Sequence, residues 1–311
     1  MTARFVFGRL GMLTSQAMAP DHGDTRAARL QKALDEMSPD ERAEKVSAAL
    51  VRKAFLDALP NVRNTLIDFV ALEQRVRALR NEYASARPFP HVVIDDFLPG
   101  SSFERVLAAM PGQGPAEPRW NDLNSAMADG RPAQTEKLHL DNALLMRPIL
   151  RELMGELNCA AFLTLLGQLT GIHGLLSDPY LTGAGVHVVR PGGMLRVHTD
   201  FREHPTLNLD RRLNLLLYMN PDWKEAYGGH LELWNEDSTR VVRRILPIAN
   251  RCVIFGTTDR SFHGHPRPLT CPDDRHRQSI ALYYFTTKPR DAGSKPSYTT
   301  NWQVLPDEGE R

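Results

Sequence analysis

The second half of the chain is divided into short, strand-like runs, and this feature limits the possible folds most. Between residues 185 and 287, stretches rich in Val, Ile, Leu and aromatic residues alternate with Gly, Pro, Asn and Asp. Runs of this length are typical of β-strands, and their close spacing favours a β-sandwich or a barrel. The predicted strands are residues 185–190, 195–200, 212–218, 230–234, 240–246, 252–256 and 277–287.

The first 88 residues carry helical patterns and predict a helical N-terminal extension. The stretch 38–41 contains Ser, Pro and Glu in the order of a capping box, so a helix is expected over residues 38–59. From Leu66 to Tyr83 apolar residues recur at spacings of three and four, which indicates an amphipathic helix that ends before Pro88. We expect its apolar side to pack on a sheet or on a partner subunit.

The pattern changes at residue 89, where we place the start of the main domain, residues 89–290. Residues 92–94 are β-branched and lie between prolines, which predicts a strand. Ser101 and Glu104 have the spacing of a capping box, so we expect them to cap a short helix that follows.

Two longer segments complete the main domain before the β-rich half. Residues 111–135 are rich in Gly, Pro, Asn and Asp without periodicity, which predicts a long loop, either a binding loop or a flexible insertion. Residues 144–169 are rich in Leu and predict a helical stretch. Residues 291–311 are expected to form a C-terminal tail.

Composition narrows the function classes. The chain of 311 residues is 42% hydrophobic and 24% charged, as in ordinary soluble globular proteins. A formal net charge of +1 gives no broad field toward phosphate backbones or anionic lipid, so nucleic acid and membranes are not expected partners. Three widely spaced cysteines without a CxxC pair, and the lack of a signal-like or spanning apolar run, lead us to expect a cytoplasmic protein.

One strand-like run carries a metal-binding pattern. His198 and Asp200 are two residues apart, so on a strand both side chains point to the same face. A third ligand must come from a distant strand, and His263 and His265 follow the run 252–256. Two histidines and one carboxylate with open positions suit non-haem Fe(II), although Zn²⁺ accepts the same ligands.

These residues together resemble a known family. HTD at 198–200, the histidine at 263 and RQSIALYYF at 277–285 are similar to the HxD…H…RxS signature of the Fe(II)- and 2-oxoglutarate-dependent oxygenases, in their prolyl-4-hydroxylase-like branch. The resemblance also covers FPHVVIDDFLP from residue 89, the RPGG turn at 190–193 and GGHLELW at 228–234, and it excludes residues 1–88.

The resemblance implies a fold and a set of site residues. The fold would be α+β, a double-stranded β-helix (jelly-roll or cupin-like) core with flanking helices. His198, Asp200 and His263 would hold Fe(II), with His263 preferred over His265 by its position in the motif. Arg277 would meet the distal carboxylate of 2-oxoglutarate, and a forked guanidinium suits that role. Ser279 and Tyr218 would also contact this carboxylate. Arg275 is the alternative to Arg277, and it is rejected because only Arg277 is followed two residues later by a serine.

The family chemistry would couple oxidation of 2-oxoglutarate by O2, giving succinate and CO2, to hydroxylation of a substrate C–H bond. Because Asp200 is present, hydroxylation or another oxidation is expected rather than halogenation, which related halogenases achieve with Gly or Ala in its place. A small-molecule or amino-acid-like substrate is our first expectation, a protein (prolyl-type) substrate the second, and a homodimer is possible.

Other readings of the same residues stay open. The β-domain would be a non-catalytic binding module if its metal were structural or absent, and a zinc hydrolase is a third reading. Both are disfavoured by Arg277 and Ser279, because a structural zinc needs no carboxylate anchor. His187, His204 and His230 are more often structural than functional in such strands.

Overall fold

The structure is a computed structural model that describes residues 35–38, 42, 53, 57, 64–112, 119–287 and 300–303. The chain divides into two compact units, Met1–Ala54 and Phe55–Arg311, and all the β-structure of the described residues belongs to the second. Across the described ranges, no helix has both the length and the apolar composition needed to cross a membrane. Most residues of the helix predicted over 38–59 and most of the tail predicted from 291 lie outside the described residues.

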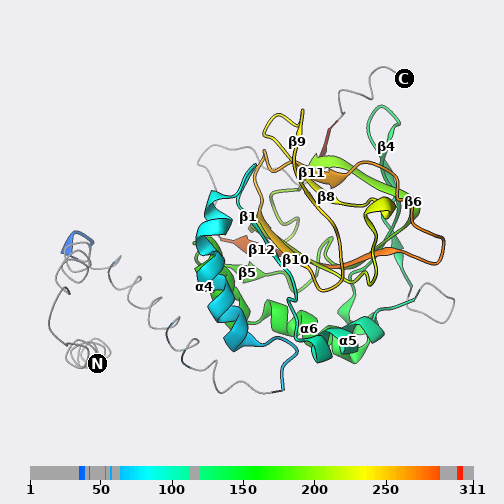
Figure 1. Cartoon of the computed structure of the whole chain (residues 1–311). Helices are drawn as coiled ribbons and strands as arrows, with labels where there is room; N and C mark the ends of the chain where they lie inside the picture. The colour runs from blue at the N-terminus through cyan, green and yellow to red at the C-terminus, as the bar shows by residue number, and fades with distance from the viewer. Residues whose placement is uncertain are drawn as a thin grey trace. The chain divides into compact units, whose positions relative to one another are not determined.

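The core consists of antiparallel strands in the order β1-β10-β7-β12-β6-β11-β8-β9, which curl into a half-barrel (Figure 1). The sheet has two layers because strand β6 belongs to both. Its first part pairs with β12, and its last part pairs with β11. This pairing is that of a double-stranded β-helix, so the expected fold class is confirmed. The bounds are β1 His91–Ile94, β6 Gly185–Thr199, β7 Asp210–Tyr218, β8 Leu231–Trp234, β9 Val241–Ile245, β10 Cys252–Gly256, β11 His263–His265 and β12 Arg277–Thr286.

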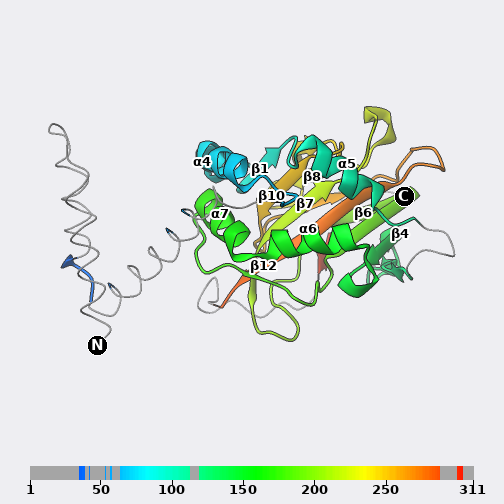
Figure 2. The same ribbon diagram turned by 90° about the horizontal axis from the view of Figure 1, so that it is seen from below.

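Four described helices cover one face of the layer that contains β10, β7 and β12 (Figure 2). They are α4 Phe69–Ser85, α5 Gly100–Ala108, α6 Pro148–Asn158 and α7 Ala160–Thr170. Alternate residues of these strands, such as Leu215, Leu282 and Ile254, are buried against the helices. The residues between them face the other layer, where Tyr218, Phe255 and Leu233 form a second apolar cluster.

Strand β6 bends at the predicted RPGG turn without ending there. Strand β4, Pro132–Leu140, pairs with β6 on both sides of this point, but residues 190–193 face only Glu136. Gly193 is required at this bulge, because an added Cβ would lie 2.5 Å from the Val189 side chain and 2.9 Å from Glu136 Cβ. The two runs predicted at 185–190 and 195–200 are therefore one strand whose two parts serve different layers.

Other predicted elements match with three corrections. The strands at 92–94, 212–218, 230–234, 240–246, 252–256 and 277–287 are confirmed within two residues at each end. The helical stretch predicted at 144–169 is present but divided. Cys159 takes an extended conformation that separates α6 from α7, and a short 3-10 helix, η2 Ala143–Leu145, precedes α6.

The other two corrections concern the segment before α6. Ser101 does not cap α5, because the helix already begins at Gly100 and its N-cap, Pro99, offers no side-chain acceptor. The loop predicted over residues 111–135 is wrong in its second part. There the chain forms β2 Asn121–Asp122, β3 Ser125–Ala126 and the start of β4.

Helix α4 packs on the main core although the sequence placed it in the extension. Its buried residues include Leu72, Val76 and Tyr83, which join the cluster that contains α7. The segment before α4 is fixed by Glu156 of α6, whose carboxylate accepts hydrogen bonds from Leu66 N and Ile67 N at 2.8 Å each. Residues 66–85 thus cover the β-domain, as expected for the apolar side of this helix, while the predicted boundary at residue 88 stays a prediction.

Replacing Leu72 tests this packing. Leu72 is 3% exposed, so Leu72→Ala is expected to lower the free energy of unfolding by about 2–5 kcal/mol in urea denaturation followed by circular dichroism. The control Val70→Ala, at a position 41% exposed on the same helix, is expected to change it by less than about 0.5 kcal/mol. Equal stability of both variants would show that α4 is not part of the cooperative domain.

Candidate metal centre

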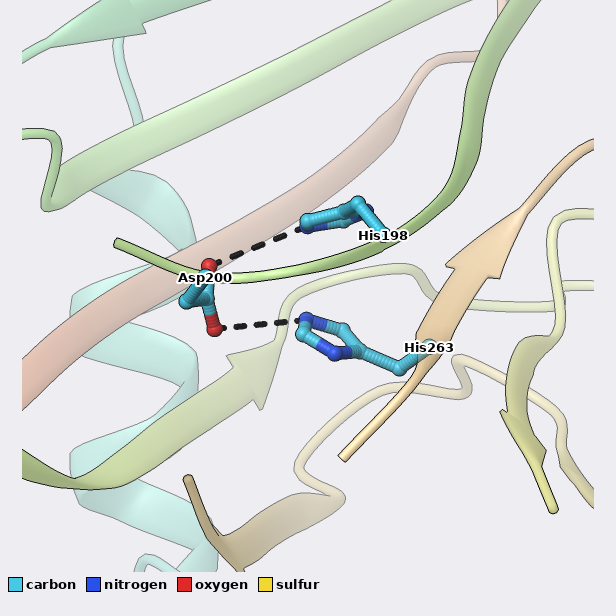
Figure 3. Close-up of side chains that lie close together, drawn as sticks. All are labelled: His198, Asp200 and His263. Carbon is cyan, nitrogen blue, oxygen red and sulfur yellow. Dashed lines mark ion pairs between the residues drawn. The ribbon is translucent and has the colours of Figure 1, made fainter. Parts of the chain in front are cut away.

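Three potential metal ligands meet where β6 and β11 pair. His198 lies near the end of β6, Asp200 directly follows it, and His263 begins β11 opposite His198 in the ladder. Their donor atoms all lie within 4.8 Å of one another. Asp200 carboxylate oxygens lie 3.7 Å from His198 Nε2 and 3.5 Å from His263 Nε2. Figure 3 shows both imidazoles turned toward this carboxylate. The sequence pattern that placed His198 and Asp200 on one face of a strand therefore agrees with the geometry.

The hydrogen bonds of both imidazoles leave their Nε2 atoms available for a metal. His198 Nδ1 lies 2.8 Å from the carbonyl oxygen of Arg196, and His263 Nδ1 lies 2.9 Å from that of Ser261. A carbonyl only accepts, so both Nδ1 atoms carry the proton and both Nε2 lone pairs point toward Asp200. Ligands at about 2.1 Å from one ion lie about 3.0–3.5 Å apart, close to the observed separations, so the residues fit a metal ion.

The carboxylate of Asp200 is held in place by two buried side chains of β7. Asn214 Nδ2 donates to Asp200 Oδ2 at 2.7 Å, and Arg211 forms an ion pair with the same oxygen at 3.2 Å. Arg211 also donates to Asn214 Oδ1 at 2.7 and 2.9 Å, and its guanidinium stacks on the ring of Tyr283. Burial raises the pKa of Asp200, but Arg211 and the two histidines outweigh it and hold the pKa well below the usual range. Asp200 is therefore ionised whenever the protein is folded near neutral pH.

The alternative ligand His265 lies outside this group of three. It is buried at the other end of β11, opposite Leu195 of β6, and neither of its ring nitrogens has a hydrogen-bond partner among the described residues. The other histidines differ in their surroundings. His204 pairs with Asp178 at 3.2 Å, and His230 pairs with Glu225 at 2.9 Å, so both have structural partners.

A cavity of about 190 Å³ connects the three ligands with the predicted co-substrate anchor. His198, Asp200, His263, Arg277 and Ser279 all line it. Tyr218 is fully buried behind the cavity wall, and its hydroxyl accepts a hydrogen bond from Arg277 NH2 at 3.3 Å. Burial raises the pKa of Tyr218 despite the nearby Arg277, so the phenol keeps its proton and remains a donor. The rejected Arg275 instead donates to the carbonyl of Pro221 and does not line the cavity.

Arg277 suits the binding of an anion. It is 7% exposed, its Nε donates to the carbonyl oxygen of Gly229 at 2.7 Å, and no carboxylate of the described residues lies within 4 Å of it. Gly229 makes room for this side chain, because an added Cβ would lie 3.0 Å from Arg277 Cδ. A buried guanidinium is costly unless an anion meets it, and a carboxylate of 2-oxoglutarate matches its fork.

Several residues of the cavity were missed by the sequence analysis. Lys137 and Gln134 reach it from β4. His187 of β6, which the sequence analysis considered more often structural, also lines it. Burial lowers the pKa of Lys137 to about 8, with Asp200 opposing the change and Arg277 adding to it. Trp302, in the short strand β13 Asn301–Trp302, pairs with β6 and stacks on His198 with ring centroids 4.8 Å apart. Of the residues around the site that the sequence analysis missed, Asn214 could have been found, because it is a polar amide within the apolar strand 212–218.

Removing each histidine of β11 tests which one binds the metal. His263→Ala is expected to weaken Mn²⁺ binding by more than about 100-fold, since losing even a residue that supports a ligand costs about 10–100-fold. His265→Ala should bind Mn²⁺ as the unmodified protein does, by titration followed with electron paramagnetic resonance. The reverse order of effects would assign the site to His265.

Arg211→Gln tests the support of Asp200. The variant removes the ion pair and the guanidinium that orients Asn214, so Mn²⁺ affinity is expected to fall by about 10–100-fold. Arg212→Gln is the matched control, because Arg212 contacts Thr286 and Asp210 instead. If both variants bind Mn²⁺ equally well, Arg211 has no part in positioning the carboxylate.

The comparisons with known proteins agree with this geometry. A sequence model described as "2OG-Fe(II) oxygenase superfamily" matches residues 184–285, the segment from β6 to β12 that contains all three candidate ligands and Arg277. A search of curated proteins finds no match to the chain.

Solved structures with a similar arrangement share little sequence with this chain. A Trichoplax adhaerens prolyl hydroxylase in complex with a hypoxia inducible factor peptide is 18% identical, with a TM-score of 0.45, covering 71% of this chain and 96% of that chain. A Phytophthora capsici prolyl 4-hydroxylase is 20% identical, with a TM-score of 0.46, covering 76% and 72%. HygX from Streptomyces hygroscopicus, with nickel, 2-oxoglutarate and hygromycin B bound, is 10% identical, with a TM-score of 0.45, covering 68% and 92%.

These TM-scores lie below 0.5, so the assignment depends on the sequence match and on the site. The match spans the two strands that carry the metal ligands and the strand that begins with Arg277. The same residues converge on one cavity with the ligand chemistry that Fe(II) and a keto acid require. Residues 184–285, which carry these groups, match the sequence model of the 2OG-Fe(II) oxygenase superfamily.

Proposed function

We propose that the protein is a dioxygenase that hydroxylates an unactivated C–H bond of a small molecule or amino-acid-like substrate. One observation carries the proposal. His198, Asp200 and His263 line the same cavity as Arg277, a buried arginine that has no carboxylate of the described residues within 4 Å. A structural metal site explains the first feature, but it gives no reason for the second. An enzyme that binds a dicarboxylate beside its metal explains both.

His198, Asp200 and His263 would hold Fe(II) through two Nε2 atoms and one carboxylate oxygen. When bound, Fe(II) with 2-oxoglutarate supplies the activation of O2 that the oxidation of a C–H bond requires. The part of the protein is to hold the ring orientation and tautomer of both histidines through their Nδ1 hydrogen bonds, which leaves the Nε2 atoms for the metal. Arg211 and Asn214 keep the carboxylate ionised and oriented.

Arg277, Ser279 and Tyr218 would bind the distal carboxylate of 2-oxoglutarate. Ser279 pairs with Tyr218 across β12 and β7, so the two hydroxyls lie on the same face of the layer as Arg277. Arg277 and Ser279 line the cavity, and Tyr218 contacts Arg277 from behind its wall. All three would donate to one carboxylate in a buried environment, where charge-assisted hydrogen bonds are strong. This arrangement would orient the keto-acid end of the co-substrate toward the three metal ligands.

The proposed preference for a small substrate is supported by the wall around the metal. Strand β4 borders the cavity on one side, and Trp302 contacts His198 on another. These walls leave a limited space beside the ligands. A peptidyl hydroxylase is the alternative, in which a protein segment would enter between the same walls. A non-catalytic metal-binding module is the other alternative.

Binding of 2-oxoglutarate tests the proposal. Anaerobic titration of the Fe(II)-loaded protein is expected to produce a saturable visible charge-transfer band. Arg277→Ala should raise the dissociation constant roughly 100-fold or more, because removing one partner of a buried charge pair costs about 3–5 kcal/mol. In air, the unmodified protein should convert 2-oxoglutarate slowly to succinate.

Arg275→Ala is the control, since Arg275 lies two residues away and its side chain hydrogen-bonds only to the Pro221 carbonyl among the described residues. It is expected to give the band of the unmodified protein at the same 2-oxoglutarate concentrations. If the unmodified protein binds Fe(II) but forms no band, the dioxygenase proposal fails and the non-catalytic module gains support.

A further inference from the structure

The cavity contains a second cation besides Arg277. Lys137 of β4 lines it and forms no ion pair or side-chain hydrogen bond with any described residue. The acid with the strongest influence on it is Asp200, which is already paired with Arg211. A lysine without an acid beside it in a cavity of this kind is costly unless a ligand supplies the anion.

The sheet register fixes where Lys137 lies relative to the anchor. Val189 of β6 pairs with Lys137 on one side and with Arg277 on the other. Directly paired residues of neighbouring strands point to the same face, so both cations face the cavity from one row, two strands or about 10 Å apart at the backbone. Lys137 thus reaches the cavity from the edge opposite to the Arg277 anchor.

A second polar group also lacks a partner in this cavity. His265 is 3% exposed, lines the cavity, and has no hydrogen-bond partner at either ring nitrogen among the described residues. The register places His265 in a row with Leu195 and Gln134, so it faces the same space as the β4 side chains. Buried polar atoms of this kind are nearly always satisfied, which points to a ligand with hydrogen-bonding groups near β4.

The charges of the cavity indicate what this ligand carries. If the proposed function holds, Arg277 is paired with the distal carboxylate of 2-oxoglutarate, and Arg211 is paired with Asp200. Among the described residues that line the cavity, Lys137 is then the cation left without a paired carboxylate, so its charge remains for the substrate. A single ammonium matches a carboxylate better than a doubly charged phosphate.

We propose that Lys137 selects substrates that carry a carboxylate, which it binds on the β4 side of the cavity while the carbon to be oxidised faces the metal ligands. The inference rests on the proposed function and narrows its substrate class to small carboxylic acids, free amino acids among them. Lys137 is a specificity residue in this role, since it touches the substrate away from the reacting carbon.

Calorimetry with the Mn²⁺- and 2-oxoglutarate-loaded protein tests this inference without turnover. The probes are free α-amino acids and small aliphatic and aromatic carboxylic acids, each compared with its own amide. At least one acid is expected to bind, and the dissociation constant of its amide should be about tenfold higher or more. A tenfold difference corresponds to about 1.4 kcal/mol of binding free energy. Lys137→Met should abolish this preference, and Lys137→Arg should restore part of it.

The control Lys224→Met changes an exposed lysine and is expected to keep the preference for acids. Lys137→Met must also bind 2-oxoglutarate within about twofold of the unmodified protein, which shows that the variant is folded. A loss of 2-oxoglutarate affinity like that of Arg277→Ala would assign Lys137 to the co-substrate and overturn the inference.

The remaining outcomes are also decisive. Equal binding of acids and amides, or binding of no acid in the panel, overturns the role of Lys137 but leaves the dioxygenase proposal in place. Tighter binding of phosphate monoesters than of carboxylates overturns the choice of anion. If the unmodified protein fails to bind 2-oxoglutarate in the first titration, the proposed function itself has failed, and the two failures are thereby distinguished.

Discussion

The pairing of β6 with both layers of the sheet is the constraint on which the site depends. One strand of 15 residues places Val189 beside Arg277 and His198 beside His263. The bulge at residues 190–193 allows this change of partners, and it requires a glycine where the backbone approaches Val189 and Glu136. The anion anchor and the metal ligands are thus fixed relative to each other by backbone hydrogen bonds rather than by flexible loops.

Within the cavity, charge is arranged so that some groups are satisfied by the protein and others are not. Asp200 has Arg211 and Asn214, so its position and ionisation do not depend on a ligand. Arg277 and Lys137 have no acid partner among the described residues. Such a division is typical of binding sites, where unpaired buried groups are retained for a ligand at a cost in stability.

The sequence predicted most of the β-domain and the main site residues because both depend on local patterns. Apolar runs bounded by Gly, Pro and Asn identified seven segments, and the spacing of His198 and Asp200 requires only that the chain be extended there. His263 could be separated from His265 only through the family motif, since both lie in the same short strand.

What the sequence left out depends on contacts between distant segments. The start of strand β4 fell in the predicted loop, and the rest of the strand, which includes Lys137, was assigned to no element because the pairing is interrupted at Glu136. Arg211 and Asn214 support Asp200 only through the position of β7 beside the end of β6. The separation of α6 from α7 follows from the extended backbone of Cys159, which has no clear signature in the sequence.

The position of the ligands on two strands also links the metal to the integrity of the fold. His198 and His263 come together only while the ladder between β6 and β11 is closed, so an ion that bridges them stabilises the closed ladder over any opened form. Each tenfold rise in metal concentration above its dissociation constant then adds about 1.4 kcal/mol to the cost of opening. Resistance to proteases would therefore report metal loading in a cell extract, and shortage of iron would shorten the lifetime of the protein as well as its activity.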